Sequence, residues 1–124
     1  MGCFFPNKLK LIYTMYQLCF YVPASHLELV KDALFVAGAG QYKEYDRCAW
    51  QTLGQGQFRP LKGSKPYMGV RDRITGIPEY KVEMICVDDK IESAISALLT
   101  SHPYERPAYS VYKILNADDL GLSI

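Results

Sequence analysis

The run His102-Pro103-Tyr104-Glu105 places an imidazole three residues before a carboxylate. These are two of the side-chain types that bind divalent metals in proteins. The chain has only two histidines, His26 and His102, so a single copy cannot supply a histidine-rich metal centre. We therefore interpret His102 and Glu105 as a candidate metal pair. A bound divalent metal stays open, and the sequence indicates no required cofactor.

The same run has a purely structural interpretation as a rigid connection. Pro103 and Pro107 restrict φ, and His102 would lie at the end of a helix, where its charge is favourable. In an oligomer this run could also meet a neighbouring chain, and several copies could supply the ligands that one copy lacks. We predict a subunit interface at Tyr104, Pro107 and Tyr109.

Residues 59–73 form a basic stretch in a nearly neutral chain. They hold five Lys and Arg and one acidic residue, Asp72, which gives a local net charge of +4 against +1 for the whole chain. Glycine-rich backbone N–H groups beside basic side chains can bind phosphate-like anions. The alternative is a solvated loop whose charge favours solubility. No P-loop spacing is present, so the stretch does not indicate ATP-specific binding. The predicted anion site consists of Phe58, Arg59, Lys62, Gly63 and Lys65.

The sequence predicts no catalytic residue. Its four cysteines form no C-x-x-C pair, which excludes a zinc ribbon and a thioredoxin-like motif. Cys48 has no base beside it in the sequence, and no G-x-S-x-G run is present. We expect free thiols, and hence a cytoplasmic protein. No apolar run reaches the length of a membrane span, so no membrane partner is expected.

Length and composition favour one folded domain. The 124 residues are 49% hydrophobic and 22% charged, which excludes a disordered polyelectrolyte. The near-neutral net charge argues against nucleic acid as a general partner. Met15 is a candidate start, so we divide the chain into an N-terminal extension (1–14), a domain (15–115) and a C-terminal tail (116–124).

Hydrophobic periodicity predicts four strands and two helices. Alternating residues indicate strands over 16–22, 80–86 and 108–115, and a longer strand over 45–60 that is bent or bulged at Gly54 and Gly56. Residues 61–77 are rich in Gly and Pro and are expected to form a loop.

Helix boundaries are predicted from capping residues. Ser25 and Glu28 form a capping box before the first helix, and Gly38 and Gly40 end it. Asp88 or Asp89 caps the second helix, whose apolar stripe runs from Ile91 to Leu99 and which Pro103 ends.

The resulting order, βαββαβ, predicts a ferredoxin-like α+β sandwich. Its four-stranded antiparallel sheet would carry both helices on one face. A weak internal repeat supports this order, because Tyr16 and Leu18 recur as Tyr80 and Val82 at an offset of 64. The second sheet face would be bare and rich in aromatic residues, and such faces are commonly buried by oligomerisation.

Three stretches also carry a family resemblance. Residues 54–69 read G-Q-G-Q-F-R-P-L-K-G-S-K-P-Y-M-G, residues 79–84 read E-Y-K-V-E-M, and residues 102–109 read H-P-Y-E-R-P-A-Y. From about 15 to 115 the chain resembles the domain inserted in long bacterial members of the Nif-three-like (NGG-interacting-factor) family. That domain is similar to CutA and PII proteins. The resemblance implies a CutA/PII-like ferredoxin fold and a homotrimer.

The family's dinuclear metal centre lies in flanking domains that this sequence does not contain, so the resemblance transfers no hydrolase activity. We expect a binding or regulatory module rather than an enzyme, with a small anionic ligand or a protein partner. Two alternatives stay open: a divalent-metal-binding protein of the copper or zinc tolerance type, and nucleotide or nucleic-acid binding by the basic loop.

Overall fold

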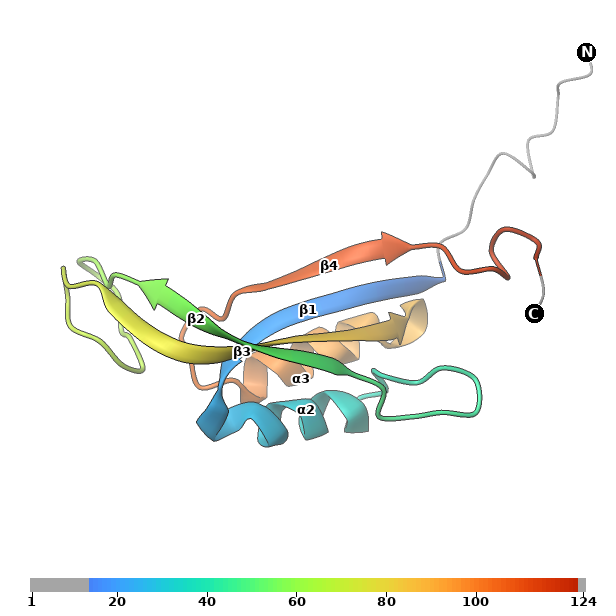
Figure 1. Cartoon of the computed structure of the whole chain (residues 1–124), viewed down its shortest axis with the longest axis horizontal. Coiled ribbons are helices and arrows are strands. Elements are labelled where there is room, and N and C mark those ends of the chain that lie inside the picture. Colours follow the sequence, from blue (N-terminus) through green and yellow to red (C-terminus); the bar gives the residue numbers. More distant parts are fainter. Residues whose placement is uncertain (1–13, 123–124) are drawn as a thin grey trace, which may run out of the picture.

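The computed structural model describes residues 14–122, so most of the predicted 1–14 extension lies outside the described residues. Within that range the strands form one sheet in the order β2-β3-β1-β4, with each neighbouring pair antiparallel. Both helices lie on one face of this sheet (Figure 1), as predicted for the ferredoxin-like α+β fold. The elements are β1 (Met15–Pro23), η1 (Ala24–His26), α2 (Leu27–Val36), β2 (Trp50–Phe58), β3 (Thr75–Val87), η2 (Asp88–Lys90), α3 (Ile91–Ser101) and β4 (Tyr109–Ile114).

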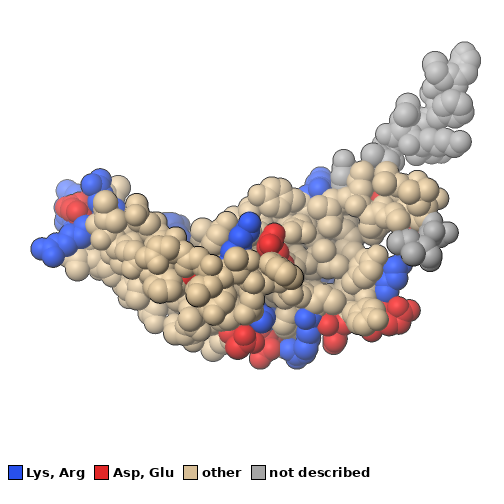
Figure 2. Space-filling model, in the orientation of Figure 1, with Lys and Arg blue, Asp and Glu red and all other residues tan. Residues whose placement is uncertain are grey.

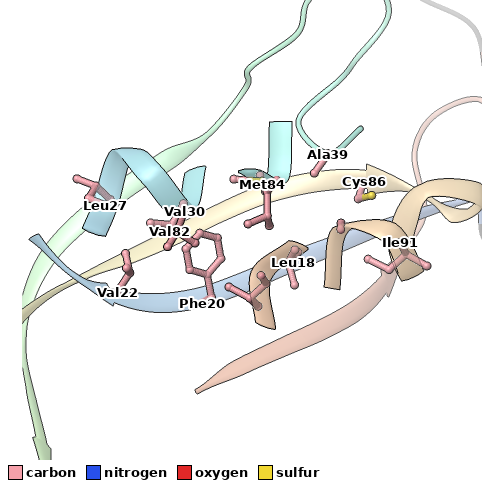
Figure 3. Packing of buried hydrophobic residues seen from close by; sticks show 13 residues of the cluster. Leu18, Phe20, Val22, Leu27, Val30, Ala39, Val82, Met84, Cys86 and Ile91 are labelled. Carbon is pink, nitrogen blue, oxygen red and sulfur yellow. The ribbon is translucent and has the colours of Figure 1, made fainter. Parts of the chain in front are cut away.

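The core lies between the sheet and the two helices, and the central strands supply much of it (Figure 3). Every second residue of β1 faces the helices because side chains alternate across a strand. Phe20 is fully buried there, opposite Val82 of β3, and the helices add apolar stripes at helical spacing. The buried residues at the centre are Leu18, Phe20, Val22, Val30, Leu34, Val82, Met84, Cys86, Ala94 and Leu98.

The predicted caps at the helix starts are wrong. A 3₁₀ turn follows β1 and another follows β3, so each helix begins one or two residues later than its predicted capping residue would place it. His26 and Lys90 occupy the N-cap positions, and neither makes a side-chain capping bond. The hydroxyl of Ser25 lies 2.9 Å from His26 Nδ1 instead of bonding to the helix.

The predicted end of the first helix is confirmed. Gly38 has φ of 109°, a conformation that favours glycine. Its N–H donates to Phe35 O, and the N–H of Ala39 donates to Leu34 O, which is the Schellman arrangement.

The second and third strands differ in length from the prediction. β2 is shorter, because residues 45–49 lie outside it, and β3 begins earlier, at Thr75. The two strands pair residue for residue from Trp50–Glu83 to Phe58–Thr75, so the expected bulge at Gly54 and Gly56 is absent from this pair. The β2–β3 loop therefore spans residues 59–74. It projects beyond the helices at one end of the molecule (Figure 1).

Residues 116–122 are tied to the rest of the domain by polar contacts. The N–H of Asn116 donates to Asp119 Oδ2, and the N–H of Asp119 donates back to Asn116 Oδ1. Thr14 Oγ1 donates to Asp119 Oδ1 at 2.9 Å, and Lys43 forms an ion pair with Asp118 at 3.1 Å.

Candidate functional site

A cavity lies where the β2–β3 loop folds back over the 102–108 connection between α3 and β4. Its volume is about 380 Å³, which is in the range of small-molecule sites. The 102–108 connection lies beside β1, since Tyr21 N–H donates to Ala108 O, and the loop reaches it through the hydrogen bond from Lys65 N–H to Glu105. The apolar and aromatic part of the lining includes Tyr21, Phe58, Pro60, Pro66, Tyr67, Met68 and Tyr104.

Three rings form one wall of the cavity. The ring centroid of Tyr104 lies 6.4 Å from that of Phe58 and 6.1 Å from that of Tyr67, with interplanar angles of 46° and 44°. Tyr67 also meets His26 edge-on at 5.8 Å. These contacts fix the loop's aromatic side chain between the start of α2 and the 102–108 connection.

A carboxylate lies against this wall. The hydroxyl of Tyr104 donates a 2.7 Å hydrogen bond to Glu79 Oε2. Burial and the neighbouring Glu79 raise the pKa of Tyr104, so this hydroxyl stays protonated as a donor. The carboxylate of Glu79 lies over Gly56 of β2, where a side chain would collide with it. Gly56 thus provides the space that Glu79 occupies.

A second carboxylate anchors the loop. The backbone N–H of Lys65 donates to Glu105 Oε1 at 3.0 Å, which joins residues 40 positions apart in the sequence. Pro60 O accepts a 2.6 Å bond from the N–H of Asp72, which closes the base of the loop. Gly69, with φ of 97°, turns close to the Phe58 ring, where a side chain would crowd that ring.

His102 lies beneath the cavity and is only 6% exposed. Tyr104 N–H donates to its Nδ1 at 3.1 Å, so Nδ1 carries no proton. Its Nε2–H donates to Tyr21 O at 2.6 Å. Burial lowers the pKa of His102, which keeps this neutral form. The side chain therefore links the end of α3 to β1.

The predicted metal ligands, His102 and Glu105, are each engaged in other hydrogen bonds. Both ring nitrogens of His102 bond to backbone groups, and Glu105 Oε1 accepts from the loop. Among residues 14–122 no group of three or more His, Cys, Asp or Glu side chains could hold a metal ion. The metal prediction gains no support from this geometry.

The predicted anion residues divide into two groups. Phe58 lines the cavity, whereas Arg59, Lys62, Gly63 and Lys65 are exposed and are not among its lining residues. Figure 2 shows Lys and Arg gathered at the left-hand tip, where Figure 1 places the β2–β3 loop. In the described chain the side chains of Arg59, Lys62 and Lys65 form no ion pair.

The predicted interface residues lie close to the same end. Tyr104 lines the cavity, Pro107 is half-buried in the connection, and Tyr109 begins β4 and is 40% exposed. Glu79 and Tyr67 line the same cavity and were not among the predicted site residues. Glu79 pairs with Gly54 of β2, two residues before Gly56, and this register is evident only in the folded sheet.

The face of the sheet opposite the helices carries aromatic side chains among polar ones. Strand pairing places Trp50 beside Glu83, and Tyr112 beside Gln17, on this face. Trp50 is 68% exposed and Tyr112 is 57% exposed. No helix in the described part of the chain is long and apolar enough to cross a membrane.

Comparison with known proteins finds no matching family model. Curated relatives do match. The chain is 36% identical over 110 residues to the "GTP cyclohydrolase 1 type 2 homolog" of Halalkalibacterium halodurans, which covers 88% of this chain and 30% of that protein. The protein of the same name from Bacillus subtilis is 38% identical over 98 residues, which is 79% of this chain and 26% of that protein. The chain thus spans about 30% of the length of these relatives.

Solved structures also match this chain. A Bacillus cereus protein related to NIF3 matches with a TM-score of 0.72 and 33% identity, over 87% of this chain and 28% of that one. The divalent ion tolerance protein CutA1 of Ehrlichia chaffeensis matches with a TM-score of 0.62 and 16% identity, over 90% and 91%. Bacillus subtilis GlnK matches with a TM-score of 0.54 and 13% identity, over 82% and 85%. The last two share the fold.

Proposed function

Since this chain is a CutA/PII-like domain related to a part of the NIF3-related proteins, we propose that it is a non-catalytic binding or regulatory module. Its ligand would occupy the cavity between the β2–β3 loop and the 102–108 connection. One observation carries this proposal: a basic loop is folded back and fastened over an aromatic cavity of about 380 Å³. Cavities of this size, mostly apolar with a few fixed polar groups, are typical of small-molecule sites.

The polar groups around the cavity support binding rather than catalysis. His102, the histidine nearest to the cavity rings, is 4.7 Å from Tyr104 by ring centroids. Its two ring nitrogens already bond to the backbone, so it is unsuited to act as a base. Glu79 and Glu105 are likewise held by Tyr104 and by the loop. These contacts shape the cavity and would orient a ligand.

A ligand-observed NMR screen of a soluble fragment mixture against the full chain tests the proposal. We expect several fragments to bind, and Ala108→Trp to abolish their binding, because Ala108 lines the cavity and an indole there would fill it. Ala49→Trp is the matched control, since Ala49 is exposed at the other end of β2. Binding that survives Ala108→Trp, or an absence of bound fragments, would contradict the proposal.

We further propose that the protein is a cytoplasmic homotrimer. The support is the resemblance to CutA and PII proteins together with the exposed aromatic residues of the open sheet face, Trp50 and Tyr112. Apolar surface of this kind is stabilised by contact with further copies of a chain. A protein partner at this face is the competing outcome, and the mass of the purified protein distinguishes the two.

Anion binding on the outer surface of the loop is a second candidate function. The unpaired, exposed side chains of Arg59, Lys62 and Lys65 favour it. A nucleotide or nucleic acid bound there would show strongly salt-dependent affinity. Charge reversal in the double variant Arg59→Glu and Lys62→Glu should abolish binding of inorganic triphosphate. Unchanged binding would remove the loop from consideration.

A further inference from the structure

The cavity and the outer surface of the β2–β3 loop differ in charge. The charged side chains that line the cavity are those of Glu79, Glu105 and Arg106, so the lining has a net charge of −1. The Arg and Lys side chains that make the loop basic are exposed and do not line the cavity. A ligand inside the cavity therefore meets carboxylates, although the surrounding surface is cationic.

The carboxylate of Glu79 is fixed by contacts with two other strands or segments. It is half-buried on β3, lies over Gly56, and accepts the hydroxyl hydrogen of Tyr104. No Lys or Arg in the described chain forms an ion pair with Glu79 or Glu105. A carboxylate that has lost part of its water and has no cationic partner gains free energy from a positive ligand group.

The aromatic wall adds a second preference for positive charge. The ring of Tyr104 lies between two others, with its centroid 6.4 Å from that of Phe58 and 6.1 Å from that of Tyr67. The face of each ring carries negative electrostatic potential, so it attracts ammonium groups. The same rings pack well against an apolar or aromatic ligand body. The carboxylates of the cavity thus favour a positive group, and its rings favour an apolar or aromatic body in the same ligand.

We propose that the cavity binds a small organic cation, in which an ammonium group is attached to an apolar or aromatic body. The ammonium group would lie at the carboxylates of Glu79 and Glu105, and the body would lie against Phe58, Tyr67 and Tyr104. This inference rests on the proposed function, which makes this cavity the ligand site, and it adds the chemical class of the ligand.

Three probes that share one benzyl body test the sign of the preferred charge. Benzylamine, benzyl alcohol and benzoate are titrated into the full chain at pH 7, and backbone amide shifts are followed by NMR. We expect benzylamine to shift amides around the cavity and to bind at least tenfold more tightly than benzyl alcohol, with benzoate weakest. Glu79→Gln should remove this preference. Glu83→Gln, on the same face of β3 four residues further on, should preserve it.

A second variant, Glu105→Gln, keeps the test valid if Glu79→Gln does not fold, and it should reduce the preference in the same direction. Equal binding of benzylamine and benzyl alcohol, or tighter binding of benzoate, would overturn the cation inference while leaving the cavity as a ligand site. No shift with any probe would also overturn it. The fragment screen with Ala108→Trp decides the proposed function separately, since it does not depend on charge.

Discussion

His102 is held in one protonation state by its surroundings. Burial lowers its pKa, and its two backbone partners require one protonated and one unprotonated ring nitrogen. In the unfolded chain the histidine takes up a proton near pH 6.5. Below that pH the unfolded state binds more protons than the folded state, so the free energy of unfolding falls as the pH falls. Above it, this contribution is fully present.

We therefore predict a loss of stability between pH 7.5 and pH 5, measured as the midpoint of urea unfolding. His102→Gln should be less stable at pH 7.5, by about 1–3 kcal/mol because a buried hydrogen-bonding group is replaced, and its midpoint should change less with pH. His26→Gln is the control, because His26 is half-exposed, and it should retain the wild-type pH dependence. Equal pH dependence in both variants would contradict the assignment.

Gly56 and Gly54 form a matched pair for a second prediction. A methyl group on Gly56 would collide with the Glu79 side chain, whereas on Gly54 its nearest neighbour would be a backbone oxygen at 4.0 Å. Gly56→Ala should displace the Glu79 carboxylate and break its bond to Tyr104, at a cost of about 1 kcal/mol of unfolding free energy. It should also weaken benzylamine binding.

Gly54→Ala should leave benzylamine affinity unchanged, since its methyl group makes only ordinary contact. NMR titration of the two variants measures the difference. If both variants bind benzylamine as the wild type does, Glu79 does not contribute to the cavity in the way described.

Single residues of the site could be predicted from the sequence only in part. Phe58, Tyr104 and Glu105 were singled out and do line the cavity. Glu79 was not, because its position depends on the register between β2 and β3, two paired strands that a long loop separates in the sequence. Local sequence patterns do not show which distant residue a side chain faces. The difference in charge between the loop surface and the cavity could therefore not be predicted.

At the scale of elements, the fastening of the β2–β3 loop gives a third prediction. Glu105 holds the loop through one hydrogen bond to Lys65 N–H, and a bond to a charged group contributes about 1.5–3 kcal/mol. Glu105→Ala should open the loop more often and speed tryptic cleavage after Lys62 by about tenfold. Glu92→Ala, an exposed acidic residue on α3, is the control for lost charge. Equal cleavage rates would show that the loop is held by other contacts.

The elements themselves were largely predictable because alternation and helical spacing report burial directly. β1, the 80–86 part of β3 and the apolar stripes of both helices lie where periodicity placed them. The helix starts were not predictable, because 3₁₀ turns displaced the caps, and Ser25 turned to His26 instead. β2 was also misjudged in extent, since most of its side chains are exposed and give a weak pattern.

For the whole molecule, the homotrimer gives a fourth prediction. Light scattering of the purified protein should give about 42 kDa, three times the 14.1 kDa of one chain. Replacing the exposed Trp50 on the open sheet face with Glu should lower that mass, because a buried charge without a partner is unfavourable. Leu29→Glu, on the helix side, is the control. A mass near 14.1 kDa for the wild type would contradict the trimer.

The pairing of the outer and inner strands has one more consequence. Met15 at the start of β1 lies directly opposite Ile114 at the end of β4, so the polypeptide enters and leaves the domain through neighbouring positions (Figure 1). Paired residues of antiparallel strands are only about 5 Å apart. A host protein could therefore carry this domain as a cassette in one surface turn, and its gain or excision would leave the host's own packing nearly unchanged.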